Sequence, residues 1–324
     1  MSIKFKNVLL FIIVMITGII VASCGNADEK AIEVSKDAQV RTRTVGNKTP
    51  KLTVYIETND INPLNAGEYR FCGTTEEVVD HVILFASNIR GNCNSVWLHH
   101  NPNQTHILNN VNTLVRPLQN KGIKVLLGLL GDHTGVGFAN LTPAMIESFA
   151  TQVANCVNTY GLDGVDFDDE YAKYGTLACT PALPNPSSTI HGNLIQRLRF
   201  KLDSIFPPSA TSPRKLITAF NFGYTGFNQA TMNALDYMWP NYGCSSYPPS
   251  GLPNSKWAKL SVNFSPLNPG QSTIQNCASS YAGYGALMTF NLRDYNCSGI
   301  MNYFAYDVWG EDVCWTGTVH PKNY

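Results

Sequence analysis

The chain has 324 residues, of which 44% are hydrophobic and 14% charged, and its formal net charge at pH 7 is zero. This length is enough for a substantial core and by itself allows two domains. Without residues 1–23, which hold two lysines and no acid, the chain has 21 cationic and 23 acidic side chains, a net charge of −2. A chain so close to neutral carries no electrostatic sign of nucleic-acid binding, and we expect no nucleic-acid partner.

The first 23 residues have the features of a targeting segment. Lys4 and Lys6 form a basic start, residues 8–21 are almost wholly apolar, and Val21-Ala-Ser-Cys24 resembles a bacterial lipobox, in which the cysteine is lipidated and becomes the new N-terminus. We predict a lipoprotein signal peptide over residues 1–23, with Cys24 as the lipidation site. A conventional secretory signal and a retained membrane helix are the alternatives, and the apolar run is short for a membrane span.

Residues 24–50 are polar, carry charges of both signs and show no apolar period, which predicts a flexible tether. The chain is then an exported bacterial lipoprotein at the outer membrane or cell surface, with the periplasmic face as the alternative. It meets the membrane only through its lipid anchor, and we expect a monomer.

From residue 51 onward, strand patterns alternate with helical patterns. The strand patterns fall at eight places: 52–57, 82–86 within 78–89, 124–130, the acidic stretch 166–170, 216–222, 235–239, 259–264 and 285–292. The helical patterns fall at 108–118, 142–160, 193–206 and 299–308. No linker-like break interrupts them, so residues 51–324 are predicted to form one α/β domain: a single (β/α)8 TIM barrel of roughly 250 residues plus a tail, in which helices can be irregular or missing.

Nine cysteines occur in the chain. With Cys24 assigned to lipid, eight remain, an even number in an exported protein, where disulfides form, although the sequence does not determine their pairing. The loops that hold Cys72, Cys93, Cys179 and Cys244 allow all four to share one barrel face. No C-x-x-C pair occurs and the histidines do not cluster with the cysteines, so we expect no metal site and no cofactor.

The most informative stretch is Gly161-Leu-Asp-Gly-Val-Asp-Phe-Asp-Asp-Glu-Tyr171, in which four carboxylates lie within five residues. Like charges so close persist only if protons are shared or if a cation or substrate group intervenes. On a strand, Asp166, Asp168 and Glu170 point to one side and the residues between them to the other. In a barrel, these three acids would climb one inner wall to the C-terminal rim, where barrel enzymes act.

A row of acids such as Asp166, Asp168 and Glu170, here called the ladder, can shift the pKa of its last member, Glu170. Asp166 and Asp168 can hold one proton between them, and Glu170 can stay protonated near neutral pH and act as a general acid. A calcium loop is one alternative, but the glycine and the bidentate glutamate that it requires are not placed correctly here. A solvated acidic turn is another, but Val165 and Phe167 between the acids favour a buried strand.

The motif Asp163-Gly-Val-Asp-Phe-Asp-Asp-Glu170 resembles the D-G-x-D-x-D-x-E signature of glycoside hydrolase family 18. Its continuation through Gly175 is similar to the endo-β-N-acetylglucosaminidases of the endoglycosidase H and F1 type. Further segments similar to that branch occur in the same order across nearly all of the barrel: 62–65, 85–89, 124–127, 131–140 and 236–243. The resemblance implies a hydrolase that cuts the GlcNAc-β-1,4-GlcNAc chitobiose core of N-linked glycans, of high-mannose or hybrid type, on glycoproteins.

The resemblance also implies retention through substrate assistance, in which the 2-acetamido carbonyl of the sugar attacks its own anomeric carbon. Glu170 would protonate the leaving oxygen and then activate water, Asp168 would hold the acetamido N–H, and Asp166 would buffer the charge on Asp168. Tyr242 would donate a hydrogen bond to the acetamido oxygen. The family's Trp-Asn-Pro-Tyr-Tyr form is replaced here by Trp239-Pro-Asn-Tyr242, which leaves Tyr237 as the alternative donor.

Other residues are candidates for substrate contact or support. Trp239 and Trp97 could stack on sugar faces, with core packing as the alternative for each. His133 either touches the sugar or has a structural role. Asp163 is assigned to orienting the start of the strand, and Asp169 to capping or pairing between the barrel and its helices. The substrate-binding candidates are Asn241, Tyr237, Trp239, His133 and Asn88.

Two further functions compete with the endo-β-N-acetylglucosaminidase. A chitinase would use the same chemistry, but the loops after the second, third and sixth strands resemble the endoglycosidase branch, and no inserted α+β domain is evident. An inactive surface glycan-binding protein would commonly lack the acid, whereas Asp166, Asp168 and Glu170 are all present.

Overall fold

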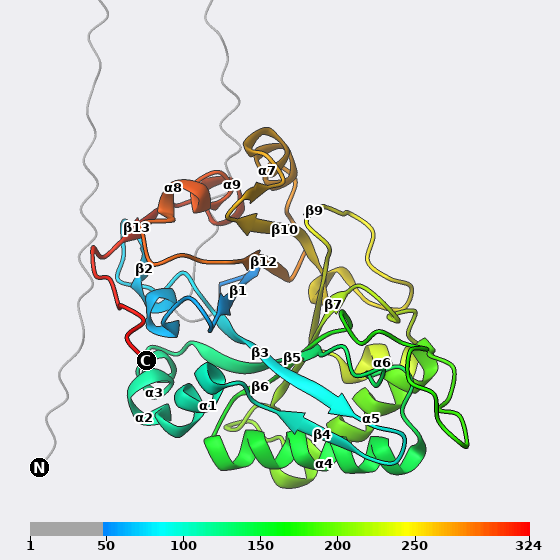
Figure 1. Ribbon diagram of the computed structural model, residues 1–324. Helices are drawn as coiled ribbons and strands as arrows, with labels where there is room; N and C mark the ends of the chain where they lie inside the picture. The colour runs from blue at the N-terminus through cyan, green and yellow to red at the C-terminus, as the bar shows by residue number, and fades with distance from the viewer. Residues whose placement is uncertain (1–47) are drawn as a thin grey trace, which may run out of the picture. The chain divides into compact units, whose positions relative to one another are not determined.

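The computed structural model describes residues 48–324, and eight parallel strands form its centre (Figure 1). Neighbouring strands follow the order β10-β12-β1-β3-β5-β6-β7-β8, and an isolated parallel bridge pairs Met238 of β8 with Trp257, directly before β10, so that the two ends of this order meet. The predicted (β/α)8 barrel is confirmed, with one strand at each of the eight expected places. The strands are β1 (Lys51–Glu57), β3 (His81–Gly91), β5 (Lys124–Gly131), β6 (Gly164–Asp168), β7 (Leu216–Asn221), β8 (Tyr237–Pro240), β10 (Ala258–Phe264) and β12 (Ala286–Phe290).

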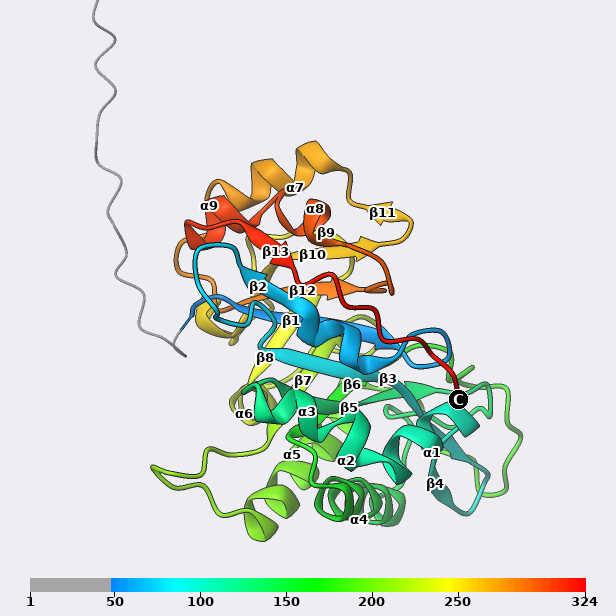
Figure 2. The same ribbon diagram turned by 90° about the vertical axis from the view of Figure 1, so that its left-hand side faces the viewer.

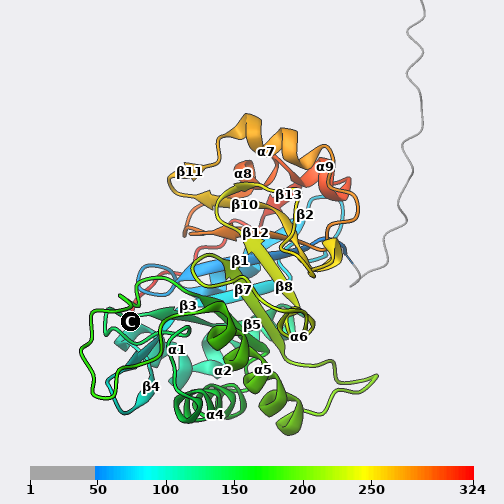
Figure 3. The ribbon, with the colours of Figure 1, turned by 90° about the vertical axis from the view of Figure 1, so that its right-hand side faces the viewer.

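Helices cover two flanks of this sheet. Figure 2 shows α1 to α6 on one flank and α7 to α9 on the other, and Figure 3 shows α7 beside β10 and β11 (Leu267–Asn268). The helices are α1 (Pro102–Asn109), α2 (Val111–Leu114), α3 (Arg116–Asn120), α4 (Pro143–Tyr160), α5 (Ser188–Ile205), α6 (Gln229–Ala234), α7 (Gln271–Ala278), α8 (Ser298–Met301) and α9 (Ala305–Trp309).

Two of the crossovers contain no α-helix. Between β1 and β3 the chain forms the 3-10 helix η1 (Pro63–Glu68) and β2 (Tyr69–Phe71), which pairs with β13 (Val313–Trp315). Between β8 and β10 it forms β9 (Gly243–Cys244) and η2 (Asn254–Lys256). β4 (Val96–His99) folds back antiparallel on the long β3. The expectation of missing helices is met at these two crossovers.

Two predicted helices are divided in the structure. The stretch 108–118 is covered by α1, α2 and α3, and α1 begins six residues earlier than predicted because the Asn101 side chain accepts the N–H of Gln104 as an N-cap. The stretch 299–308 is covered by α8 and α9, separated by residues 302–304. Local polar caps, which a search for apolar periodicity does not weigh, account for the early start of α1.

Helix α4 delivers the chain to the acidic strand with well-defined ends. The Thr142 side chain accepts the N–H of Met145, and Pro143 occupies the first turn, where its missing N–H costs no hydrogen bond. Gly161 ends the helix in the left-handed conformation, with φ of 60°. Two residues later Asp163 accepts the N–H of Val125 at 3.0 Å, which fixes the start of β6 against β5.

The core has two layers. Inside the barrel, Tyr55, Ile83, Leu126, Trp239 and Met288 belong to one buried apolar cluster. Residues that alternate with these along the strands, such as Leu52, Val54 and Ile56 of β1, pack outward against the helices.

Within residues 48–324, three disulfides join segments far apart in the sequence: Cys72–Cys314, Cys93–Cys179 and Cys244–Cys277. Cys156 and Cys297 are buried free thiols, so the eight remaining cysteines do not all pair. The four loop cysteines do not share one face as the sequence allowed. Cys93 and Cys179 join the β3–β4 hairpin to the loop after β6, whereas Cys72 follows β2 on the flank, and Cys244 is joined to the outer helix α7.

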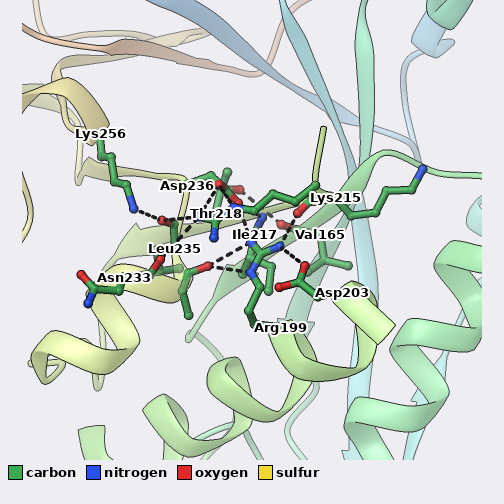
Figure 4. Close-up of polar contacts among 12 residues, drawn as sticks. Val165, Arg199, Asp203, Lys215, Ile217, Thr218, Asn233, Leu235, Asp236 and Lys256 are labelled. Atoms are coloured by element: carbon green, nitrogen blue, oxygen red, sulfur yellow. Dashed lines mark hydrogen bonds and ion pairs between the residues drawn. The ribbon is translucent and has the colours of Figure 1, made fainter. Parts of the chain in front are cut away.

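The N-terminal end of the barrel is held by aspartates that precede strands. Asp80, Asp163 and Asp236 accept the backbone N–H of Leu52, Val125 and Ile217 at 2.7, 3.0 and 2.8 Å. Asp236 also pairs with Arg199 and Arg214, and Figure 4 shows the Asp236–Arg199 contact between α5 and the start of β8. A cavity of about 740 Å³ opens at this end, away from the acidic ladder, and its walls include Asp80 and Asp163.

Lys48, the first residue that the structure describes, packs against the barrel: it is 6% exposed and pairs with Asp80. The Trp309 indole N–H donates to the Pro50 carbonyl at 3.0 Å, so the last three residues of the predicted tether belong to the folded unit. The predicted signal peptide, Cys24 and the rest of the tether lie outside the described residues. Within residues 48–324, no helix combines the length and apolar character needed to cross a membrane.

Candidate active site

Strand β6 carries two of the acids on its inner face. Its five residues are all buried, and Phe167 points outward, with its ring centroid 5.2 Å from that of Phe138. Asp166 points inward, where its carboxylate accepts hydrogen bonds from the hydroxyls of Tyr55 and Thr218, both at 2.6 Å. The structure therefore has the alternation expected of the acidic strand.

Asp168 is the buried acid of this strand whose carboxyl has the fewest stabilising contacts. It is 7% exposed, and its Oδ1 has no hydrogen-bond partner among residues 48–324. Burial, followed by the charges of Glu170, Asp166 and Asp169, raises the pKa of Asp168 to about 9. Burial raises the pKa of Asp166 only to about 6, because its two hydroxyl donors stabilise the carboxylate. The proton predicted to be shared by this pair therefore belongs on Asp168 at neutral pH.

Glu170 lies just after the strand rather than in it, which corrects the prediction of a strand through residue 170. β6 ends at Asp168, which makes the last register pair with Leu130 of β5, and Tyr171 then adopts the left-handed conformation with φ of 59°. Asp169 points to the outer side, where it accepts hydrogen bonds from the Tyr174 hydroxyl and, at 2.9 Å, from the Tyr224 N–H. Glu170 remains partly exposed at the C-terminal rim. Burial raises the pKa of its carboxyl, which favours the protonated form that a general acid requires.

The loop after β5 holds the backbone around Glu170. Gly131, His133 and Gly135 donate their N–H groups to the carbonyls of residues 170, 171 and 172 at 3.1, 2.7 and 2.9 Å. A Cβ at position 131 would lie 2.2 Å from the Glu170 carbonyl oxygen, so only glycine permits this approach. The position of Glu170 thus depends on the glycine that ends the neighbouring strand β5.

Tyr242, just after β8, faces the acids. Its ring lies 5.9 Å from that of Phe290 and 6.3 Å from that of Phe220, at the upper edge of the inner cluster. Burial, followed by the charges of Asp168 and Glu170, raises the pKa of its hydroxyl, so this hydroxyl is a donor at neutral pH. Tyr242 is thus placed where a donor beside Asp168 is needed.

The other two polar candidates near β8 do not reach the acids. Tyr237 lies at the opposite end of the strand, where its ring is 5.3 Å from that of His81 and burial, followed by the charges of Asp236 and Asp80, raises its pKa to about 12. This position corrects the assignment of Tyr237 as an alternative donor. Asn241 is exposed, and its side-chain oxygen accepts the backbone N–H of Tyr242 at 2.8 Å.

Trp239 is a support for the ladder and not an exposed sugar platform. It is 0% exposed, and its indole N–H donates at 2.8 Å to the Tyr55 hydroxyl that binds Asp166. A sugar cannot stack on a ring that is fully covered, so the core-packing alternative holds for Trp239. Trp97 on β4 is 39% exposed and keeps a face open.

His133 and Asn88 lie at the C-terminal side of the barrel. His133 is exposed in the loop after β5, and its ring is 5.6 Å from that of Tyr171 beside Glu170. Asn88 is half-buried on β3 and donates to the Gly131 carbonyl at 3.2 Å. The strand register aligns Asn88 with Leu130, and Leu130 with Asp168, so Asn88 stands level with Asp168 two strands away.

Three residues of this site were not found from the sequence. Tyr55 and Thr218 bind Asp166, and Glu57 ends β1 near Tyr242 and Tyr171, whose pKa values its charge helps to raise. The alternation Thr53, Tyr55, Glu57 in the first strand is the signal that could have placed Tyr55 and Glu57 on the inner wall.

No group of three or more histidine, cysteine, aspartate or glutamate side chains within residues 48–324 is arranged to hold a metal ion. Two hydroxyl donors hold the Asp166 carboxylate, whereas Asp168 Oδ1 is left without a partner in this part of the chain.

A (β/α)8 barrel with an ordered acid ladder at the C-terminal end of one strand defines a barrel hydrolase that acts by acid–base chemistry. Residues 51–237 match the family model "Glycosyl hydrolases family 18". The chain belongs to this family, and it is a glycosidase.

Similar proteins have been characterised. An endo-beta-N-acetylglucosaminidase of Flavobacterium sp. (strain SK1022) is 36% identical over 276 residues, 81% of each chain, and endo-beta-N-acetylglucosaminidase F1 of Elizabethkingia meningoseptica is 29% identical over 90% of this chain and 88% of the relative. EndoBT-3987 of Bacteroides thetaiotamicron, solved with a Man5GlcNAc product, is 28% identical with a TM-score of 0.70; the similarity covers 86% of this chain and 65% of that one. Its structure with a Man9GlcNAc2Asn substrate has a TM-score of 0.71, at 28% identity over 86% of this chain and 70% of that one.

Proposed function

We propose that the protein is an endo-β-N-acetylglucosaminidase that hydrolyses the GlcNAc-β-1,4-GlcNAc bond in the chitobiose core of N-linked glycans. The observation that carries this proposal is the position of Asp168 and Glu170 side by side at one rim of the barrel. The Oδ1 atom of Asp168 is buried there and has no hydrogen-bond partner in the described chain. The acetamido N–H of a bound N-acetylglucosamine can supply that partner. An orienting group next to a general acid is what substrate-assisted hydrolysis requires.

In the first step, Glu170 gives its proton to the glycosidic oxygen, and the C1–O bond breaks as the acetamido carbonyl oxygen bonds to C1. The product is an oxazolinium ring on the α face of the sugar, opposite the departing oxygen, and the leaving saccharide is released as an alcohol. Asp168 passes the proton that it holds at neutral pH to Asp166, accepts the acetamido N–H as a carboxylate and stabilises the positive charge, while the Tyr242 hydroxyl binds the acetamido oxygen.

In the second step, the Glu170 carboxylate removes a proton from water, whose oxygen attacks C1 and opens the oxazolinium ring. Two displacements at C1 give net retention of the β configuration. Asp166 can hold this proton because its own pKa is raised to about 6, and it returns the proton to Asp168 once the positive charge is lost.

High-mannose or hybrid N-glycans are the substrates that we propose. The support is the similarity to EndoBT-3987, whose solved structures hold Man5GlcNAc and Man9GlcNAc2Asn. The curated relatives, which are named for the same activity, cover most of this chain.

The test is to incubate the purified protein with a denatured high-mannose glycoprotein and to determine the masses of both products. The expected result is one N-acetylglucosamine left on the polypeptide and one at the reducing end of the released glycan. The Glu170→Gln protein, as the control, should bind the glycan but release about 10²–10⁴-fold less of it, the range typical of a lost general acid. Cleavage of chito-oligosaccharides with no release from glycoproteins would favour a chitinase, and binding without turnover in the natural sequence would favour a glycan-binding protein.

We also propose that Cys24 carries lipid and anchors a monomeric enzyme at the outer membrane or cell surface. The support for the anchor is the basic and apolar segment at the start of the chain, which ends in a lipobox-like sequence at Cys24. Metabolic labelling with a fatty-acid analogue should mark the natural protein but not Cys24→Ser. Equal labelling of both proteins would rule out Cys24 as the lipidation site.

A further inference from the structure

Glu57 is an acid at the barrel mouth that the mechanism above does not use. It ends β1, where the register pairs Thr53 with His81, Tyr55 with Ile83 and Glu57 with Phe85. Thr53 bonds His81 at 3.0 Å, and Tyr55, Ile83 and Phe85 belong to the inner cluster. Since side chains alternate along a strand, Glu57 also faces the inside, one level above Tyr55 toward the C-terminal end.

The same mouth contains the residues proposed for acetamide binding and proton transfer. The ring of Phe290 lies 5.6 Å from that of Tyr55 and 5.9 Å from that of Tyr242, so a single side chain links the top of β1 to Tyr242. The charge of Glu57 helps to raise the pKa of Tyr242 and of Tyr171, which follows Glu170. Glu57 is therefore close enough to both tyrosines for its charge to act on their hydroxyls.

The Glu57 carboxyl has no direct partner within residues 48–324. Its carbonyl accepts backbone N–H groups, but no hydrogen bond or ion pair of at most 4.0 Å reaches its side chain there. Arg293 lowers its pKa only from a distance and is itself bonded to Asn291 at 2.8 Å, while burial and Asp60 raise that pKa. The carboxyl is partly exposed at the mouth, so its two oxygens are open to accept hydrogen bonds from a ligand.

We propose that Glu57 is a substrate-binding residue that accepts hydrogen bonds from hydroxyl groups of the N-acetylglucosamine held between Tyr242 and Tyr171. This inference rests on the proposed function for the identity of the sugar. A carboxylate offers two acceptor oxygens and suits a pair of pyranose hydroxyls. Glu57 would thus hold the sugar ring from the β1 side while Asp168 and Tyr242 hold its acetamido group from the β6 and β8 sides.

The test compares glycan affinity in proteins that cannot turn substrate over. Calorimetry measures the Kd of a high-mannose glycosyl-asparagine and of tri-N-acetylchitotriose for Glu170→Gln, and for the same protein with Glu57→Ala, Glu57→Gln or Asp60→Asn. We expect Glu57→Ala to weaken binding of the glycosyl-asparagine by about tenfold or more and Glu57→Gln, which keeps one acceptor oxygen, to weaken it less. Asp60→Asn is the matched control, an exposed neighbouring acid, and should leave Kd within about threefold.

The outcomes separate the two claims. If Glu170→Gln binds the glycosyl-asparagine and Glu57→Ala binds it equally well, the inference is wrong and the proposed function stands. If only chitotriose binds, and Glu57→Ala weakens it, the role of Glu57 holds while the glycan assignment fails. If neither ligand binds Glu170→Gln in its folded state, both claims fall. Glu57→Gln is nearly isosteric with the natural residue. If Glu57→Ala fails to fold, the binding measured for Glu57→Gln still tests the inference.

Discussion

The backbone N–H of Gly131 donates to the carbonyl oxygen of Glu170 at 3.1 Å, and a Cβ on residue 131 would lie 2.2 Å from that oxygen. The general acid therefore owes its place to a residue on another strand. This contact joins the last residue of β5 to the loop after β6 at the C-terminal end of the barrel, where a shift of about 1 Å can cost about 100-fold in rate.

Gly131→Ala should displace the backbone of Glu170 and lower kcat by about 100-fold, while the barrel stays folded. Gly299→Ala is the matched control, since nothing lies within 4 Å of a Cβ built at that position. Steady-state kinetics on a glycopeptide, together with circular dichroism, check the result. Unchanged kcat in Gly131→Ala would show that the contact does not position the acid.

Asp168→Asn should be more stable than the natural protein at alkaline pH. The pKa of Asp168 is raised to about 9 in the folded protein, so its contribution to stability is fully present below its unfolded pKa near 4 and is lost as the pH rises toward 9. Asparagine cannot ionise, so the gain in melting temperature of Asp168→Asn over the natural protein should grow between pH 4 and pH 9. A gain that does not change over this range would contradict the raised pKa.

Tyr55→Phe should reduce kcat by about tenfold with little change in KM, because the hydroxyl supports Asp166 from below the substrate site. The lost hydrogen bond had lowered the pKa of Asp166, so this pKa should rise further, and the acidic limb of the pH–rate profile should move to higher pH. Tyr242→Phe, which removes a proposed substrate contact, should leave the acidic limb in place. Identical profiles for Tyr55→Phe and the natural protein would exclude the support role.

Asp236→Asn should weaken the N-terminal end of the barrel without changing catalysis. It removes a carboxylate that pairs with Arg199 and Arg214 and accepts the Ile217 N–H, so we expect a loss of about 2–4 kcal/mol in the free energy of unfolding, measured in urea. Glu147→Gln, which removes an exposed pair with Arg197, should change the urea midpoint little. A lower kcat/KM in folded Asp236→Asn would show coupling between the two ends of the barrel.

The sequence was sufficient for features that depend on local patterns. Buried apolar runs marked the strands, Thr142 and Gly161 mark the ends of α4, and alternation placed Asp166 and Asp168 on one wall. The limit of that reasoning is visible at Glu170. Alternation alone extended the strand through this residue, but the pairing of β6 with β5 ends at Asp168, and Tyr171 turns the chain with a φ of 59°.

Features that depend on which strands become neighbours could not be predicted. Tyr55 and Asp166 are 111 residues apart, and their hydrogen bond exists only because the barrel closes. Trp239 is of a residue type that often stacks on sugar rings, yet the strands around it bury it completely. The pairing of Cys93 with Cys179 likewise follows from the contact between the β3–β4 hairpin and the loop after β6.

The most direct measurement is proton NMR of the first glycan released from a Man9GlcNAc2-asparagine substrate, recorded before the reducing end equilibrates. The account predicts a released glycan that ends in a single N-acetylglucosamine, initially in the β configuration, because Glu170 and the acetamido group act in two successive displacements at C1. An initial α configuration, or a released glycan that ends in two N-acetylglucosamine units, would contradict it.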